Sequence, residues 1–429
     1  MPPVIGIDFG TTNSVVALLQ PDGQVATARY AVGAAELEVF RSVLCFWAEE
    51  GVSGRAALRH ATGPAAIDAY LDDPLGSRLI MSLKSYLAQR SLGEVRILGR
   101  AYPLEDLAAL LLRGLLGAAA GSLGGMGALA GAHVVAGRPV RFVGGTADDA
   151  LGERRLRGAF AAAGWRDLTV ALEPEAAGHR FAATLEGAAT VLVGDFGGGT
   201  SDFSILRFDP GARRRVEALG HAGVGLAGDA LDYRIIDRVI SPLLGKGSHY
   251  TVMGGSPLPV PPAWYASFAR WHRLSLMRAP KTLREIGEVM RTAEAPERLA
   301  HLVRLVEDEA GYALYQAVSS AKAELSRAAS TVLRFAHGGF RVEAEVARAD
   351  FEGWIAPELA QFGTAIDRAL ADAGLRAAEV DRVFLTGGTS LVPAVRRLFE
   401  TRFDPARIAG GSEFVSVAEG LALIGGAGR

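Results

Sequence analysis

Short apolar runs alternate with glycine-rich polar turns in the first part of the chain. Residues 4–9 are mostly apolar, residues 10–14 read Gly-Thr-Thr-Asn-Ser, and residues 15–19 are apolar again. Two such runs around a short turn predict a β-hairpin. The pattern recurs at residues 190–196 and 203–208, around Gly-Gly-Gly-Thr-Ser-Asp. The recurrence predicts an internal duplication, with two related lobes facing one another.

Longer patterns fill the rest of the chain and predict an α/β fold. The predicted helices lie at residues 104–120, 148–163 and, broken near 242–262, over 229–330; strands are predicted at 133–136 and 168–172. Residues 380–426 read as strand, Gly-Gly turn, helix, strand and helix.

Composition excludes several classes of protein. The 429 residues are 49% hydrophobic and carry a net charge of −2, so no bulk charge favours nucleic acid or an anionic membrane. The single cysteine, Cys45, excludes an internal disulfide. Residues 114–132 carry no charge but are rich in glycine and follow Arg113, so we expect a buried helix and a glycine-rich loop there, not a membrane span. With no signal peptide at the N-terminus, a cytoplasmic location is predicted.

The first glycine-rich turn has the residue types of a phosphate site. Glycine lets backbone N–H groups approach a phosphate, threonine hydroxyls add donors, and an aspartate at a strand end can hold a hydrated Mg²⁺. The turn supplies Asp8, Gly10, Thr11, Thr12 and Asn13. An ordinary hairpin turn looks similar, so alone this signal is weak.

The second turn makes the signal specific. Three successive glycines are unusual in a β-rich segment. Two such turns on opposing lobes could hold one polyphosphate from both sides, with Asp8 and Asp195 reaching one metal ion. The second turn supplies Asp195, Gly197, Gly198, Gly199, Thr200 and Asp202.

Two further segments complete the candidate site. A buried strand ends at Gly387-Gly388-Thr389, where a flat ring or a phosphate can rest against backbone and a helix N-terminus. Glu173 precedes Pro174 at the expected start of a helix. Glu173 is either a helix cap or the group that orients an attacking water.

These motifs resemble the ATPase domain of the DnaK-type heat-shock chaperones, in order and spacing over essentially the whole chain. The resemblance rests on residues 5–14, 173–177, 194–204 and 387–393, with residues 321–326 and 416–420 similar to the family's adenosine-contacting and last connecting helices. It implies the actin/hexokinase/heat-shock ATPase fold, in which two duplicated ribonuclease-H-like lobes surround a nucleotide cleft.

The resemblance also implies roles for the matched positions. Asp8, Asp195 and Glu173 would organise Mg²⁺ and the lytic water, with Thr200 beside the γ-phosphate of ATP. The phosphates would be held by both turns, with Gly228 closing over them. The nucleoside would be framed by Lys322, Ser326, Gly387, Gly388 and Thr389.

The chain departs from the family at the nucleoside and at the catalytic lysine. Leu391 stands where the family carries an adenine-stacking arginine, and Ser319 and Ala323 replace a glutamate and an arginine. Lys84 aligns with a lysine next to the catalytic one, and Arg96 is a loose positional candidate. We therefore expect altered adenine recognition and slow hydrolysis.

The sequence predicts lobe I at residues 1–186, with residues 408–429 returning to it, and lobe II at 187–407, with a helical subdomain at about 229–330. As in the short YegD-type relatives, no peptide-binding domain is expected. The leading hypothesis is an ATP-binding, slowly hydrolysing conformational switch that an unknown protein partner reads. The alternatives are a nucleotide-binding scaffold without turnover and, less favoured, a small-molecule kinase or an actin-like filament protein.

Overall fold

The computed structural model describes residues 3–32, 35–50, 56–73, 76–143, 146–182, 185, 187–209, 215–252, 255–270, 275–410 and 415–427. Contacts divide the chain into two compact units. The larger unit comprises Met1–Gly228 and Leu359–Arg429, and the smaller one Asp229–Glu358. The lobe boundaries expected from the sequence separate the two duplicated halves, whereas these units are defined by contacts. The lobe boundaries therefore stay a prediction.

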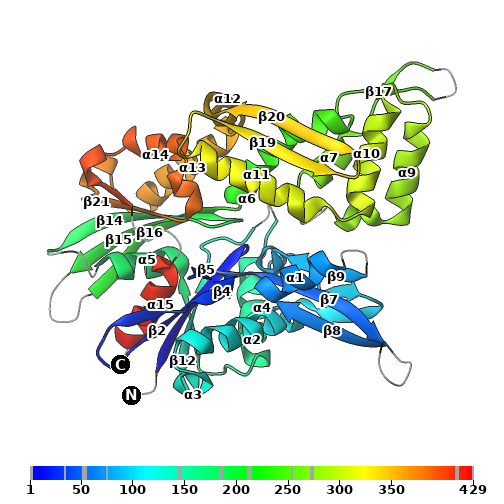
Figure 1. Ribbon diagram of the computed structural model, residues 1–429. Coiled ribbons are helices and arrows are strands. Elements are labelled where there is room, and N and C mark those ends of the chain that lie inside the picture. Colours follow the sequence, from blue (N-terminus) through cyan, green and yellow to red (C-terminus); the bar gives the residue numbers. More distant parts are fainter. Residues whose placement is uncertain are drawn as a thin grey trace. The chain divides into compact units, whose positions relative to one another are not determined.

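The larger unit contains two sheets with the same strand order (Figure 1). In each, a meander of three antiparallel strands is followed by two strands parallel to the first. The first sheet comprises β1 (Val4–Asp8), β2 (Asn13–Leu19), β3 (Val25–Thr27), β12 (His133–Arg138) and β13 (Leu168–Leu172), with β6 (Phe40–Arg41) paired to β2. The second comprises β14 (Ala189–Phe196), β15 (Ser201–Asp209), β16 (Arg215–Val224), β21 (Arg382–Thr386) and β22 (Ile408–Gly410). The predicted duplication and α/β fold class are confirmed.

Two helices cross between these sheets. α5 (Glu173–Ala182) follows the last strand of the first sheet but packs on β14 and β15, whereas α15 (Ser416–Ala427) follows the second sheet and packs on β1 and β2. The helices also pack on each other, with the red α15 beside the blue strands in Figure 1. A Cβ on Gly420 would collide with the carbonyl of Ala176, so the close crossing requires glycine. Each sheet therefore packs on the helix that follows the other sheet in the chain.

The segments inserted into the larger unit form an α/β layer of their own. A three-stranded sheet packs with α1 and α2, and α2 packs on α4. The elements are β4 (Tyr30–Val32), β5 (Ala35–Leu37), β7 (Val43–Glu50), β8 (Ala56–Thr62), β9 (Ser77–Met81), β10 (Glu94–Ile97), β11 (Arg100–Pro103), α1 (Pro64–Asp72), η1 (Leu83–Tyr86), α2 (Leu104–Ser122), α3 (Met126–Leu129) and α4 (Asp149–Ala162). The unit ends with α13 (Ala356–Asp372), η5 (Ala377–Glu379), η6 (Gly388–Leu391), α14 (Pro393–Glu400) and η7 (Pro405–Arg407), besides strands already given.

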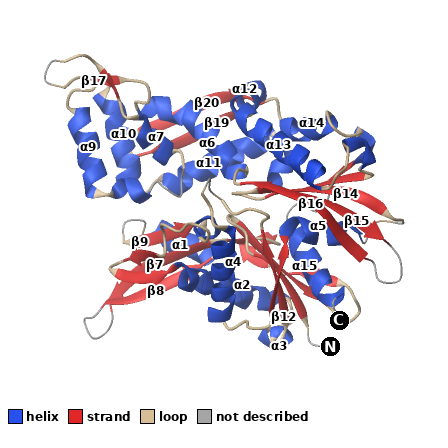
Figure 2. Cartoon of the chain, turned by 180° about the vertical axis from the view of Figure 1, so that it is seen from behind, coloured by secondary structure: helices blue, strands red, loops and turns tan. Residues whose placement is uncertain are grey.

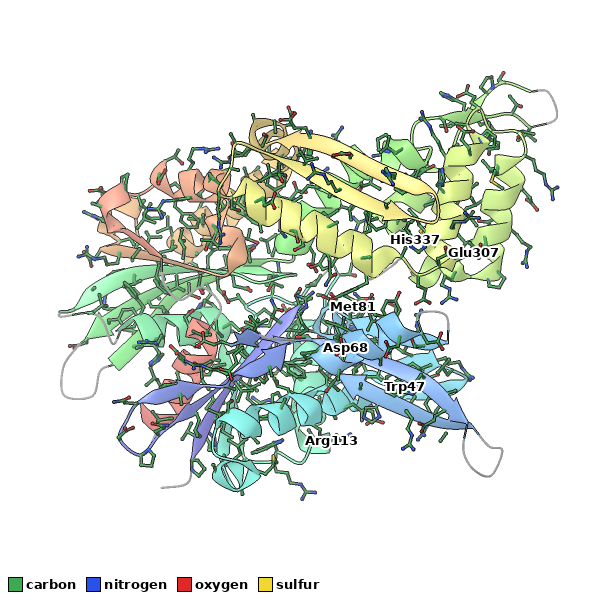
Figure 3. The ribbon with its side chains drawn as sticks, viewed as in Figure 1. Trp47, Asp68, Met81, Arg113, Glu307 and His337 are labelled. Carbon is green, nitrogen blue, oxygen red and sulfur yellow. The ribbon has the colours of Figure 1, made fainter. Side chains whose placement is uncertain are left out.

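The uncharged segment at residues 114–132 forms the second half of α2, then α3 and glycine-rich turns. Arg113, labelled in Figure 3, lies on α2, and its Nη1 donates to the carbonyl of Ala162 at 2.7 Å. Leu115, Leu116 and Ala119 are buried in the core. A buried helix with a glycine-rich loop is confirmed. Among the described residues, no helix is long and apolar enough to cross a membrane.

The smaller unit is mostly helical, as the sequence predicts for residues 229–330. In Figure 2, α9 and α10 lie side by side, and the hairpin of β19 and β20 covers α11. Its elements are α6 (Gly228–Ile235), η2 (Ile236–Ile240), η3 (Ser241–Leu244), β17 (His249–Tyr250), β18 (Leu258–Pro259), α7 (Pro262–Phe268), η4 (Ser275–Arg278), α9 (Pro280–Met290), α10 (Pro296–Glu307), α11 (Gly311–Leu325), β19 (Ser330–His337), β20 (Phe340–Ala347) and α12 (Arg348–Trp354). The expected break near residues 242–262 corresponds to η3 and the short strands β17 and β18.

Candidate functional site

The first turn joins β1 to β2 and leaves one hydroxyl without a hydrogen-bond partner among the described residues. Ser14 Oγ accepts from the backbone N of Gly10 at 3.2 Å, and Arg41 Nη1 donates to Asn13 Oδ1 at 3.0 Å. A Cβ on Gly10 would collide with the carbonyl of Asn13, so the turn requires glycine. Thr12 Oγ1 is buried and makes no hydrogen bond to any described residue. A buried hydroxyl of this kind can donate to a ligand oxygen.

The second turn joins β14 to β15 and lies against the first. The backbone N of Gly197 donates to the carbonyl of Thr200 at 2.9 Å, and that of Gly228 donates to the carbonyl of Gly197 at 3.4 Å. A Cβ on Gly199 would lie 3.2 Å from Thr11 Oγ1 and 3.5 Å from Ser85 Oγ. The two turns and η1 therefore meet at Gly199.

Four carboxyl groups surround Lys84 at this meeting point. The Lys84 ammonium forms an ion pair with Glu173, and each side chain is only 7% exposed. The charges of Glu173 and Lys84 act on Asp8, Asp195 and Asp202. Gly137, on β12, makes room for Glu173, because a Cβ there would lie 3.0 Å from its Cγ. The ends of β1, β14 and β15 and the start of α5 thus bring their acidic residues to one place.

Burial and mutual repulsion raise the pKa values of the aspartates. Desolvation, with a smaller contribution from Glu173, raises the pKa of Asp8 to about 7 and that of Asp202 to about 8. The same causes, in the same order, raise the pKa of Asp195 well above its ordinary value. Burial alone would lower the pKa of Lys84, but Glu173 and Asp8 outweigh it and the pKa is raised. With these carboxyl groups ionised, the cluster would have more negative charge than Lys84 balances, and a cation would stabilise that state.

Sequence reasoning did not select Lys84, which the structure places on the carboxylate of Glu173. The alternative candidate, Arg96, is exposed on β10. The contact joins residues 89 positions apart. Asp202 was noted as part of the second turn but given no role. Its Oδ1 accepts from the backbone N of Val140 at 3.0 Å and of Arg141 at 3.3 Å.

The third turn lies beside the second. Thr386 pairs with Asp195 across the parallel strands, and a Cβ on Gly387 would collide with the carbonyl of Phe196. Gly387 has a φ of +86°, which favours glycine. The η6 helix that follows includes Gly388 and the buried Thr389 and ends at Leu391, which is 43% exposed.

Two predicted nucleoside residues, Lys322 and Ser326, belong to the smaller unit. Lys322 Nζ forms an ion pair with the buried Asp232 Oδ1 at 2.8 Å, which ties α11 to α6. Ser326 Oγ donates to the carbonyl of Lys322 at 3.4 Å. Their part in framing a nucleoside stays a prediction.

The residues of the larger unit fit ATP with Mg²⁺. Two glycine turns and the buried Thr12 hydroxyl offer donors to phosphate oxygens. Among the described residues, no three acidic, histidine or cysteine side chains are arranged to hold a metal ion. Mg²⁺ keeps several waters and binds through one or two carboxylates plus phosphates, which suits Asp8 and Asp195.

Comparisons with known proteins point to one family. Residues 302–427 match the family model described as Hsp70 protein. The chain is 26% identical to "Chaperone protein DnaK" of Thermus thermophilus, over 98% of this chain and 60% of the relative. It is 27% identical to that of Deinococcus radiodurans over 93% and 55%, and 26% identical to that of Thermosipho africanus over 97% and 58%. The chain thus spans less than two thirds of the length of these relatives. These matches confirm the resemblance of the chain to the DnaK-type Hsp70 proteins.

Proposed function

We propose that this chain binds ATP with Mg²⁺, hydrolyses it slowly and serves as a nucleotide-dependent conformational switch. The observation that supports this proposal most strongly is that four side chains lie together beside the two glycine turns. They are those of Lys84, Glu173, Asp8 and Asp195. This chain is similar to proteins named DnaK, and the proposal takes that similarity as a guide to its activity.

Each group has a chemical task in the proposed reaction. Bound Mg²⁺ would neutralise charge on the phosphates, and Asp8 and Asp195 would hold it through water. Glu173 accepts a proton or a hydrogen bond from the attacking water. Lys84 pairs with Glu173 and supplies positive charge next to the transferred phosphoryl group.

The packing of the two crossed helices on the sheets supports the proposed switch. β14 carries Asp195 and β1 carries Asp8, while α5 and α15 cross between the two sheets. A ligand held by both turns would favour one arrangement of the crossed helices over others. An unknown partner protein would recognise that arrangement by binding to it. Location in the cytoplasm and likeness to short YegD-type relatives are further parts of this proposal.

The test compares the native protein with Glu173→Gln. Single-turnover phosphate release from Mg·ATP should fall by about 10²–10³-fold in the variant, because the base is lost. The dissociation constant for Mg·ATP should change by less than about threefold, because Glu173 is not a phosphate ligand. Equal release by both proteins would contradict the assigned role.

A nucleotide scaffold without turnover is the second candidate. It is favoured by the exposed Leu391 at the family's adenine-stacking position. Tight binding with no phosphate release from the native protein would select it. Transfer of phosphate to an added small molecule would indicate a kinase, and ATP-dependent sedimentation would indicate a filament protein.

A further inference from the structure

Three polar side chains join the first turn of α5 to the second sheet, next to the site described above. His221, on β16, lies opposite Ser204, on β15, in the antiparallel ladder. Its Nδ1 lies 2.6 Å from Ser204 Oγ, and its Nε2 lies 3.4 Å from Glu175 Oε1. Ser204 is fully buried, and the side chains of His221 and Glu175 are 24% and 28% exposed. The chain of contacts therefore links α5, β15 and β16.

A single tautomer of His221 satisfies both contacts. With its proton on Nε2, the ring accepts from the Ser204 hydroxyl through Nδ1 and directs its N–H toward the Glu175 carboxylate. The backbone N of His221 donates to Asp372 Oδ2 at 3.1 Å, so the backbone is held as well. The ring is held from β15 and the backbone of His221 from α13, and the ring presents one donor to α5.

Glu175 is more than a helix cap. It is the third residue of α5, and its carboxylate accepts from the backbone N of Leu172, as in a capping box. A cap does not require a histidine on another strand. Burial raises the pKa of Glu175, while His221 and Arg138 oppose that rise. Arg138 ends β12 and also pairs with Glu153 at 3.2 Å. Glu175 therefore lies between His221 and Arg138, which come from strands of different sheets.

We propose that Glu175 and His221 form a positioning pair that holds the first turn of α5, and with it Glu173, against the two glycine turns. The inference rests on the proposed hydrolysis of ATP. Glu173 is two residues before Glu175 on the same turn, and its carboxylate must meet both Lys84 and a water. A shift of about 1 Å in such a group can lower a rate by up to about 100-fold. The Lys84 contact restrains the side chain, and the Glu175 contact restrains the backbone that carries it.

The experiment is a double-mutant cycle of Glu175→Gln and His221→Gln on steady-state ATP hydrolysis. Glutamine keeps a hydrogen-bonding side chain at each position without the charge. Each single variant should lower kcat by about tenfold while KM changes by less than about threefold, and the double variant should equal either single one. His133→Gln is the matched control, because His133 pairs with Asp167 at 2.9 Å at the other end of β12.

The outcomes separate this inference from the proposed function. Additive losses, or equal changes in kcat and KM, would overturn the positioning pair while hydrolysis stands. Absence of turnover in the native protein would overturn the proposed hydrolysis, and the inference falls with it. The NMR signals of the His221 ring give a readout that does not need activity. They should change in Glu175→Gln, and unchanged signals would contradict the pairing.

Discussion

The two hairpins of the larger unit share a topology but not a chemistry. In the first, Asp8 lies opposite the buried Val15; in the second, Asp195 lies opposite Asp202. Asp202 reaches the loop after β12 and accepts two backbone N–H groups there. In the first hairpin, the Thr12 hydroxyl makes no hydrogen bond to any residue that the structure describes. The two hairpins therefore differ: the second offers an additional carboxylate and the first a hydroxyl donor, which suits one asymmetric ligand held from two sides.

The largest expected effect comes from Lys84, which both hairpins face. Lys84→Met should lower single-turnover hydrolysis by about 10²–10³-fold, because positive charge near the reacting phosphate is lost. It should also lower the unfolding free energy, since Glu173 would stay buried without its partner. Lys246→Met is the matched control, because Lys246 pairs with Asp237 at 2.5 Å in the smaller unit. Equal rates in both variants would contradict a role for Lys84.

Next in size is the loss of either strand-end aspartate. Asp8→Asn and Asp195→Asn should each weaken nucleotide binding in Mg²⁺ by about tenfold, while binding measured in EDTA stays constant or tightens. Calorimetry with and without Mg²⁺ measures both. The control is Asp68→Asn, on the exposed side of α1 (Figure 3). If only one of the two aspartates mattered, the hairpins would not share a cation.

The aspartates also predict how stability depends on pH. The pKa values of Asp8 and Asp202 in the folded protein, about 7 and about 8, lie above their ordinary value. Groups with raised pKa values favour the folded state at low pH, and this contribution is lost as pH rises through the folded values. The unfolding free energy of the metal-free protein should therefore decrease between about pH 4 and pH 8, by a few kcal/mol on an order-of-magnitude basis.

Urea denaturation at several pH values measures this slope. Asp202→Asn should match the native protein at about pH 4 and exceed it at about pH 8, because the amide keeps an acceptor without a buried charge. Saturating Mg²⁺ and nucleotide should reduce the slope in the native protein. A variant with an unchanged slope would show that Asp202 does not titrate in this range.

The smallest expected effect concerns Thr12. Thr12→Val removes a buried hydroxyl that makes no hydrogen bond to the described residues, so stability of the ligand-free protein should rise by up to about 1 kcal/mol. Nucleotide affinity should fall by about threefold, the value of one hydrogen bond. Thermal unfolding and calorimetry measure the two. Unchanged affinity would mean that the first turn does not donate through this hydroxyl.

The fold and most residues of the candidate site can be predicted from the sequence, because they depend on local patterns. The strand, aspartate and glycine turn at Asp8 recurs at Asp195, and both form the expected hairpins. Gly387, with its positive φ, marks the third turn in the same way.

The missed features depend on contacts between distant segments. Lys84 meets Glu173 only because η1 follows the inserted sheet and lies against α5, and no spacing in the sequence encodes that approach. The crossing of α5 and α15 depends on Gly420, which looks in the sequence like any small helix residue. The contact of His221 with Glu175 likewise requires the register of β16 on β15.

The most direct test of the central claim is calorimetric titration of the native protein with ATP, ADP and GTP in Mg²⁺, followed by phosphate release on the same sample. We predict binding of ATP and ADP, with slow release of phosphate from ATP. No binding of any of the three nucleotides would show that the paired turns hold no phosphate and would contradict the account.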